Sequence, residues 1–271
     1  MAHYLPRIFT ALFVSGLFFA SCKTVATTPK TAANQGDFYE LRTYHIQNKA
    51  QEQSVDNYLQ QALLPTLHRA GWKNIGVFKP VDTDTANAGK RIFVLLPAGS
   101  LEALAQLPQT LLNDPQYASS GQAYQQATND LPPYKRMEIS WLSAFSGHPR
   151  LAVPKIGTPR SERIYEIRSY ESATEKLYAN KVHMFNVADE IGLFDKLGFN
   201  AVFYGTVLAG PRMPNLIYMI AFDNTAARDA HWKAFVDSPE WKKMTALPEY
   251  QAKNVSKIDS YLLHPTAYSD F

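Results

Sequence analysis

The chain has very little cysteine: among its 271 residues the only one is Cys22. A single cysteine excludes an intramolecular disulfide, and no thiol remains for nucleophilic catalysis if Cys22 is modified. A strong excess of charge is also lacking. The net charge is +3 at pH 7, and Arg7, Lys23 and Lys30 lie in the first 37 residues. Because a nucleic-acid-binding surface needs clustered positive charge, we expect no nucleic-acid partner.

Several motifs that identify enzymes are absent as well. The sequence has no G-x-G-x-x-G run, no Walker phosphate loop and no G-x-S-x-G elbow. No two of its seven histidines have the H-x-x-x-H or H-E-x-x-H spacing of a metal site. We therefore expect no metal, and we have no catalytic residue set to assign from motifs.

The N-terminal segment has the pattern of an export signal. Arg7 is a short basic start, and residues 8–20 form an apolar run that is too short for a stable membrane-spanning helix. A cysteine directly after such a run resembles a bacterial lipobox, in which the thiol of Cys22 is lipidated and becomes the new N-terminus. Phe19 departs from the aliphatic residue usual in that motif. The alternative is a simple secretory peptide cleaved near Ala20–Ser21.

Both interpretations export the protein. Residues 1–22 are the expected signal peptide and lipobox, and residues 23–37, rich in Thr, Ala and Asn, are an expected flexible linker. The residue after the cysteine is Lys23, which by resemblance to the sorting rule of Gram-negative lipoproteins argues against retention in the inner membrane. We expect a periplasmic or outer-membrane-associated lipoprotein, anchored to the membrane through Cys22.

The rest of the chain contains an internal repeat. The run YELRTY at 39–44 recurs as YEIRSY at 165–170, at an offset of 126. Three later pairs keep the same order at offsets of about 124 to 126, namely 74–78 with 200–205, 91–97 with 216–222, and 113–117 with 237–241. Four ordered matches at a near-constant offset indicate a tandem duplication. We expect one domain at residues 38–150 and a second at residues 160–271.

Each copy has the pattern of a β-α-β-β-α-β unit. Period-two runs predict strands at 38–46, 74–81, 91–96 and 135–144, and at 163–170, 200–209, 216–222 and 256–263. Helical spacing predicts long helices at 50–70 and 173–197, each ended by a glycine, and proline-broken helical segments at 100–128 and 224–252. This order is that of the ferredoxin-like unit, whose two helices cover one face of an antiparallel sheet.

One such unit leaves the other face of its sheet bare, and a second copy can cover it. We therefore predict an α+β fold in which two ferredoxin-like units in tandem form a dimeric α/β-barrel with the helices outside. The opening strand is repeated because neither copy can bury its own sheet alone.

Several runs resemble the bacterial branch of the NIPSNAP family. They are MFN at 184–186, VFYG at 202–205, GPRMPNLIYM at 210–219, DSPEW at 237–241 and PTAYS at 265–269. The resemblance covers nearly all of residues 38–271 and implies tandem dimeric α/β-barrel domains. It implies no agreed reaction. Since several related barrels bind haem or carry out cofactor-free oxygenation, a haem held by His183 or His68 is the alternative to our expectation that no cofactor is needed.

The opening strands carry the main candidate site. Residues that share one face of each strand by its period of two are Glu40, Arg42, Tyr44, Glu166, Arg168 and Tyr170. Leu41 and Ile167 on the other face are more apolar, so we expect that face to meet the helices and the Glu-Arg-Tyr sets to line the barrel interior. Three roles stay open for these sets: a barrel-closing ion-pair network, an arginine that grips a ligand carboxylate, or catalysis.

Arg212 is a further candidate, because the loop at 209–215 could form the rim of the barrel mouth. The alternative is that a tight turn needs these residues. The sequence thus predicts an exported protein that binds a small organic ligand or a protein partner through the barrel. The alternative is a cofactor-independent oxygenase- or isomerase-like enzyme acting in the barrel interior. A homo-oligomer formed through exposed sheet edges is an additional expectation.

Overall fold

The computed structural model describes residues 1–3, 36–250 and 253–271. Cys22 and almost all of the predicted signal peptide and linker lie outside the described residues, so the lipid anchor stays a prediction. Within the described part of the chain, no helix is both long enough and apolar enough to cross a membrane.

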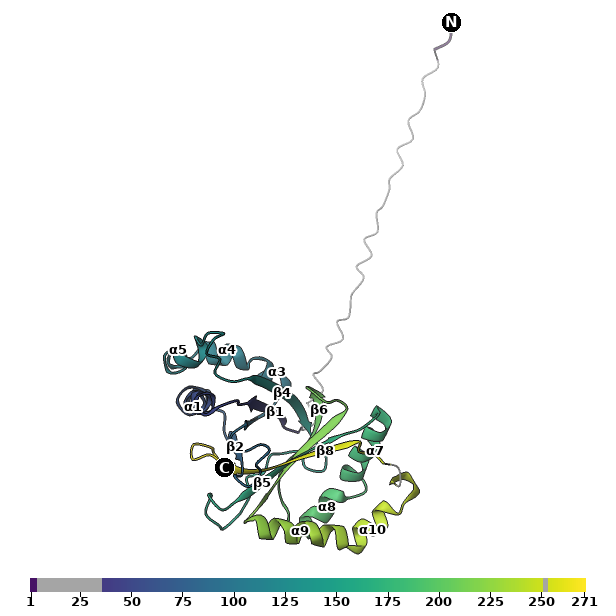
Figure 1. Ribbon diagram of the computed structural model, residues 1–271. Coiled ribbons are helices and arrows are strands. Elements are labelled where there is room, and N and C mark those ends of the chain that lie inside the picture. Colours follow the sequence, from purple (N-terminus) through teal and green to yellow (C-terminus); the bar gives the residue numbers. More distant parts are fainter. Residues whose placement is uncertain (4–35, 251–252) are drawn as a thin grey trace. The chain divides into compact units, whose positions relative to one another are not determined.

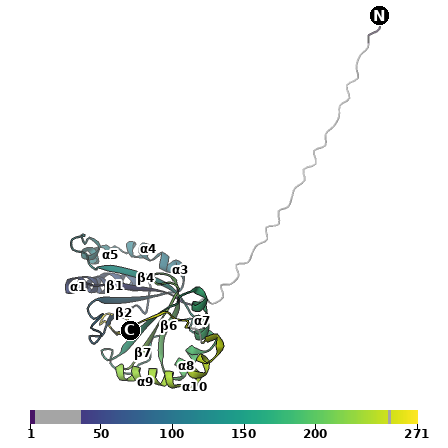
Figure 2. The same ribbon diagram turned by 45° about the vertical axis from the view of Figure 1, so that its right-hand side comes forward.

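Eight strands of the described chain form one closed antiparallel barrel (Figures 1 and 2). The strands are β1 (Phe38–His45), β2 (Gly76–Pro80), β3 (Arg91–Ala98), β4 (Arg136–Ala144), β5 (Ile164–Glu171), β6 (Asn200–Ala209), β7 (Asn215–Phe222) and β8 (Lys257–Pro265). Around the barrel they follow the order β1-β3-β2-β8-β5-β7-β6-β4. Each predicted strand overlaps one of these eight.

Residues 38–150, called the first half here, and residues 160–271, the second half, each contribute one four-stranded sheet. The strand order is β4-β1-β3-β2 in the first half and β8-β5-β7-β6 in the second. The halves join where β2 pairs with β8 and β4 pairs with β6. Each half thereby covers the sheet edges of the other, which removes unpaired backbone groups. The predicted fold class, a barrel of two ferredoxin-like units in tandem, is confirmed.

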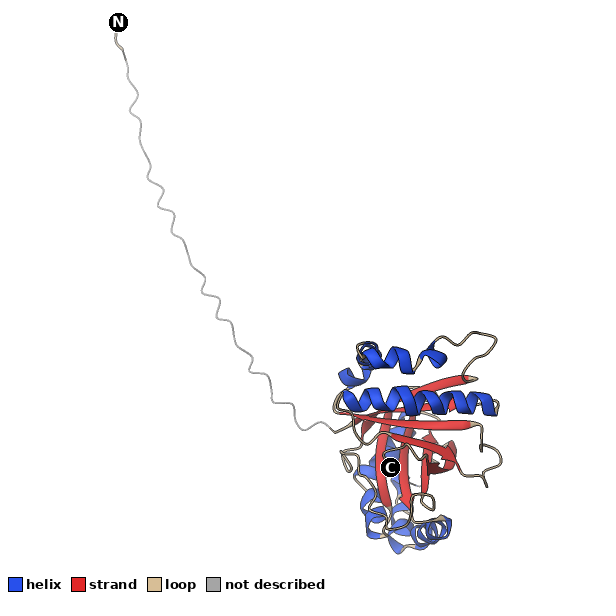
Figure 3. Ribbon diagram, turned by 90° about the vertical axis from the view of Figure 1, so that its left-hand side faces the viewer, coloured by secondary structure: helices blue, strands red, loops and turns tan. Residues whose placement is uncertain are grey.

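The helices lie outside the barrel (Figure 3). In the first half they are α1 (Lys49–Tyr58), the π-helical turn η1 (Leu59–Leu63), α2 (Leu64–Arg69), α3 (Leu101–Ala105), α4 (Leu107–Leu112), α5 (Pro115–Ser120) and α6 (Gln122–Gln125). In the second half they are α7 (Glu175–Asn186), α8 (Glu190–Lys196), α9 (Thr225–Asp237), α10 (Pro239–Thr245) and the 3-10 turn η2 (Pro248–Tyr250). Asn48, Thr174 and Asn224 begin α1, α7 and α9 by accepting a hydrogen bond from the backbone N–H three residues later.

The long helices end at Gly71 and Gly198 as predicted, with φ angles of +88° and +79°. One prediction for the helices is wrong. The segment 173–197 is not a single helix, because it breaks between α7 and α8 at Asp189, which has a φ of +68°. The corresponding stretch of the first half stays helical and passes through the π-helical turn η1 instead.

The barrel interior is filled by apolar side chains from both halves. Tyr39, Leu41, Tyr165 and Ile167 belong to this core, and the C-terminal Phe271 packs its ring 5.5 Å from that of Phe78. The predicted orientation of the opening strands is therefore wrong: Leu41 and Ile167 face the interior.

The Glu-Arg-Tyr sets lie on the opposite face, under the helices. Tyr44 packs with the helices of the first half and Tyr170 with those of the second. The physical reason is that a buried charged side chain needs hydrogen-bonding partners, and these need space. The interior of an eight-stranded barrel is only wide enough for side chains, whereas the layer between sheet and helices supplies hydrogen-bonding groups for a buried charge.

Candidate functional site

A cavity of about 600 Å³ lies between the sheet of the first half and its helices, and we call it the first-half cavity. Strands β1 and β4 supply Glu40, Arg42 and Trp141, and helices α1, α5 and α6 supply Tyr58, Tyr117 and Tyr124. Leucines of α3 and α4, together with Met137 and Ile139 of β4, make the remaining walls mostly apolar. An apolar cavity of this size with a few convergent polar groups is the usual form of a small-molecule site.

Arg42 is the charged centre of the first-half cavity. Its Nε donates to Oε1 of Glu40 at 2.9 Å, and its Nη1 donates to the hydroxyl of Tyr44 at 3.4 Å. The other carboxylate oxygen of Glu40 accepts from the indole Nε1 of Trp141 at 3.0 Å. Glu40 and Arg42 are 3% and 8% exposed. The pair is buried but satisfied, so it places a neutralised guanidinium at the cavity floor.

Tyrosine hydroxyl groups form the polar part of the cavity wall. The hydroxyls of Tyr58 and Tyr117 hydrogen-bond each other at 2.8 Å, and the ring of Tyr58 stacks on that of Tyr124 with centroids 3.7 Å apart. Burial raises the pKa of Tyr58, and the neighbouring Tyr44 and Tyr117 raise it further. Burial likewise raises the pKa of Tyr124. Both phenols are therefore neutral at physiological pH and cannot act as bases. The hydroxyl of Tyr124 donates to that of Tyr44 at 3.4 Å, and the pair of Tyr58 and Tyr117 keeps one proton to donate to a ligand.

In the second half, Glu166 is the centre of a denser network. Its carboxylate accepts hydrogen bonds from Arg168 at 2.8 Å, from Ser260 of β8 at 2.7 Å, and from Arg228 and Trp232 of α9 at 2.8 Å each. Burial alone would raise the pKa of this carboxyl group, but Arg228, Arg168 and Ser260 together lower it to about 2. The network ties helix α9 to strands β5 and β8. In the first half, none of the described helix residues bonds to Glu40.

A second cavity, of about 390 Å³, lies beside this network, and we call it the second-half cavity. Arg168 and Tyr170 of β5 line it together with residues of α7 to α10. The hydroxyl of Tyr170 accepts from Nε of Arg168 at 3.1 Å and hydrogen-bonds that of Tyr218 at 2.8 Å. Each Glu-Arg-Tyr set thus borders a cavity on the outer face of the sheet, and neither set lies inside the barrel.

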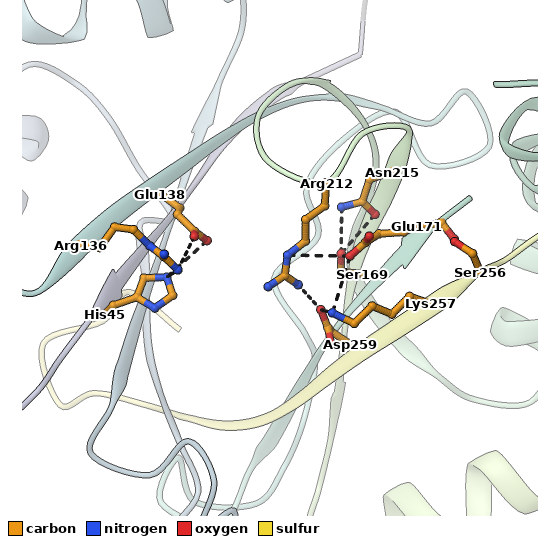
Figure 4. A network of polar contacts seen from close by, with 10 residues as sticks. All are labelled: His45, Arg136, Glu138, Ser169, Glu171, Arg212, Asn215, Ser256, Lys257 and Asp259. Atoms are coloured by element: carbon orange, nitrogen blue, oxygen red, sulfur yellow. Dashed lines mark hydrogen bonds and ion pairs between the residues drawn. The ribbon is translucent and has the colours of Figure 1, made fainter. Parts of the chain in front are cut away.

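The barrel mouth carries a separate polar cluster that includes Arg212 (Figure 4). Arg212 pairs with Asp259 of β8, and across the mouth His45 lies 3.3 Å from Glu138. Burial lowers the pKa of His45, and its neutral Nδ1 accepts a hydrogen bond from Arg91 at 2.7 Å. The space enclosed there is only about 50 Å³. Arg212 thus lies at the barrel mouth, beside a space that is too small for an organic ligand.

The histidines named for a haem make other contacts. Nδ1 of His183 lies 2.6 Å from the hydroxyl of Tyr250, and Nε2 of His68 lies 3.1 Å from Asp270. Neither histidine lines the first-half or the second-half cavity. In the described residues, no group of three or more His, Cys, Asp or Glu side chains is arranged to hold a metal ion. The haem alternative stays a prediction.

Sequence reasoning missed several residues of these sites. Trp141, Arg228 and Trp232 bond to the two glutamates from positions 62 to 101 residues away in the chain. Tyr58 and Tyr117 meet over a separation of 59 residues. The sequence feature that points to such residues is the high share of aromatic residues, 13% of the chain. This share does not show which rings contact each other.

The comparisons with known proteins agree with this architecture. Residues 165–270 match the model of the NIPSNAP family. These residues are a NIPSNAP domain. The match covers the second half, and the first half shares the strand order of this domain and its opening sequence. No curated protein matches the chain.

Solved structures resemble the whole barrel. A candidate monooxygenase from Lactobacillus acidophilus NCFM is 11% identical, covers 85% of this chain and 94% of its own, and has a TM-score of 0.53. An anthrone oxidase-like protein is 10% identical over 85% of this chain and 92% of its own, with a TM-score of 0.50. A NIPSNAP family protein from Agrobacterium tumefaciens C58 is 17% identical over 42% of this chain and 97% of its own, with a TM-score of 0.36. At these identities, the first two likenesses concern the fold alone.

Proposed function

We propose that the protein binds a small, planar, mainly apolar organic molecule with one neutral polar group, and that it does so in the first-half cavity. The observation that carries the proposal is the meeting of a buried arginine and three tyrosines with apolar walls in a space of about 600 Å³. This replaces the barrel interior as the expected binding place, because that interior is packed.

The polar groups favour a neutral ligand over an anion. Nε of Arg42 is already bonded to Glu40, and its Nη1 to Tyr44, so the guanidinium charge is balanced. The neutral hydroxyls of Tyr58 and Tyr117 can hydrogen-bond a phenol or ketone oxygen. The stacked rings of Tyr58 and Tyr124 offer a flat surface for an aromatic ring.

Native mass spectrometry of the purified protein, followed by calorimetric titration with 2-naphthol, tests the proposal. Ala105 of α3 lines the cavity and is exposed at its edge, whereas Ala103 of the same helix does not line it. We expect Ala105→Trp to weaken 2-naphthol binding at least tenfold and Ala103→Trp to leave it unchanged. Equal effects of both substitutions, or no binding of 2-naphthol by the unmodified protein, would refute a ligand site here. The role would then be binding of a protein partner.

An alternative is an oxygenase-like reaction in the same cavity, with no cofactor. Its support is the fold shared with a candidate monooxygenase and an anthrone oxidase-like protein. Glu40 is the carboxylate among the described residues lining this cavity, so it is the candidate base, and Arg42 would stabilise the resulting substrate anion. The test is oxygen uptake with anthrone, which with one O₂ gives anthraquinone and one water. Glu40→Gln should abolish uptake that exceeds the spontaneous rate, and no excess uptake by the unmodified protein removes the alternative.

We also propose that the protein is exported and anchored to the membrane by lipid on Cys22. The support is the apolar run before this cysteine. Metabolic labelling with radioactive palmitate should mark the protein but not its Cys22→Ala variant. A soluble, unlabelled product of the same size from both would favour the simple secretory peptide.

A further inference from the structure

Three cations line the second-half cavity, whereas the described lining of the first-half cavity has Arg42 alone. Of the three, Lys253 is exposed to solvent and the other two are not. Arg168 of β5 and Lys181 of α7 both line the space of about 390 Å³. The Arg168 guanidinium lies 5.5 Å from the ring centre of Tyr170, and the Lys181 ammonium lies 5.8 Å from the same centre. The two charges therefore border one ring.

Both cations have donor protons to spare. Nη1 of Arg168 donates to Glu166 and Nε to Tyr170, while Nη2 has no hydrogen-bond partner among the described residues. Nζ of Lys181 carries three protons, and its one hydrogen bond within the described chain goes to Glu190 at 2.6 Å. In the first half, by contrast, Arg42 uses Nε, Nη1 and Nη2 in contacts with Glu40 and Tyr44.

The walls of the second-half cavity are suited to a flat ring. The Arg168 guanidinium lies 4.5 Å from the ring centre of Trp232, and the Lys181 ammonium lies 5.5 Å from that of Trp241. Phe235 and Tyr250 add further ring surface. Stacking surfaces beside two cations select a ligand that is both aromatic and anionic.

The pair of Lys181 and Glu190 is not required by the fold. At the offset of 126 that relates the opening strands, the first half has Val55 and Leu64, and both are buried. An apolar pair at such positions is often at least as stable as a buried ion pair, since burying two charges costs desolvation. The side chains of Lys181 and Glu190 are only 6% and 3% exposed. A role in recognition accounts for keeping this charge pair where the sister half does without it.

We propose that the second-half cavity is a binding site for a small aromatic carboxylate, distinct from the first-half site. The ligand carboxylate lies between Nη2 of Arg168 and Nζ of Lys181, and its ring lies against Trp232 and Trp241. Glu190 balances the Lys181 charge when the cavity is empty. Because burial raises the pKa of Glu190, against the opposing effect of Lys181, this glutamate can take up a proton when the ligand anion arrives.

Calorimetric titration of the full chain with 2-naphthoate and with its neutral counterpart 2-naphthamide tests the site. We expect 2-naphthoate to bind at least tenfold more tightly than 2-naphthamide, the typical effect of a charge-assisted hydrogen bond. Lys181→Met/Glu190→Gln, which keeps shape and removes both charges, should abolish this preference. It should leave binding of 2-naphthol in the first-half cavity unchanged.

Lys181→Val/Glu190→Leu reproduces the first half and serves as a second charge-free variant if the first does not fold. Lys181→Arg keeps the charge and should keep the preference. Equal affinity of the unmodified protein for the two probes, failure to bind 2-naphthoate at all, or a preference that persists in a folded charge-free variant would each overturn the proposal. If the unmodified protein binds 2-naphthoate but not 2-naphthol, the result counts against the first-half site only.

Discussion

Replacing Glu166 by glutamine should remove a part of the folding free energy that depends on pH. The carboxylate is fully buried and is bonded by Arg168, Arg228, Trp232 and Ser260. Its pKa falls from 4.5 to about 2 in the folded protein. A shift of this size corresponds to about 3 kcal/mol of folding free energy, since each pKa unit is worth roughly 1.4 kcal/mol.

The sign follows from the direction of the shift. A carboxyl group with a lowered folded pKa stabilises the protein fully above its unfolded pKa, and this stabilisation is lost as the pH falls toward the folded pKa. At pH 7, Glu166→Gln also leaves Arg168 without its charged partner, so we expect a loss of about 3–5 kcal/mol. Between pH 6 and pH 2.5, the difference in stability between the unmodified protein and the variant should shrink by about 2.5 kcal/mol, because some of the stabilisation remains just above the folded pKa.

Urea unfolding followed by circular dichroism at a series of pH values measures this difference directly. Glu40→Gln is the matched control at neutral pH. Among the described residues, Glu40 accepts from Arg42 and Trp141 alone, both of its own sheet, so its replacement should cost less than that of Glu166. The reasoning fails if the difference for Glu166→Gln is the same at pH 6 and pH 2.5. It also fails if the control loses as much stability as Glu166→Gln at neutral pH.

Three other changes have expected outcomes that thermal or urea unfolding can check. Lys181→Met alone should lower stability by about 3–5 kcal/mol because it leaves Glu190 buried without its partner. Adding Glu190→Gln should recover most of this loss. If the losses of the two single variants instead add up in the double variant, the prediction is contradicted. Phe271→Ala should cost about 3 kcal/mol because the ring fills the barrel end against Phe78 and Tyr165, and an unchanged midpoint would show that the C-terminus does not pack there. Arg212→Ala should cost less than about 1 kcal/mol because its ion pairs lie at the solvent-exposed rim, and a larger loss would mean that the mouth cluster holds the barrel together.

Much of the fold was predictable because it depends on short-range patterns. Alternation along the strands and the glycines after the long helices placed the elements, and the repeat of YELRTY as YEIRSY showed that there are two similar units. The break at Asp189 was not predictable in this way. Its neighbours continue a helical pattern, and the break depends on a left-handed backbone at a residue other than glycine.

The predicted orientation of the opening strands was wrong. Period two separates Glu40 and Arg42 from Leu41 without saying which set faces the helices. Both faces of these strands are buried, one in the barrel and one under helices, so hydrophobicity cannot orient them.

The amino-acid sequence by itself determined the duplication, the order of strands and helices, and the identity of the charged residues on each opening strand. Only the tertiary structure decided that these charges lie outside the barrel and that the two halves surround different cavities. The physical reason is that a buried charge is stable only where partners meet it, and here those partners, such as Trp141 and Arg228, come from distant parts of the chain.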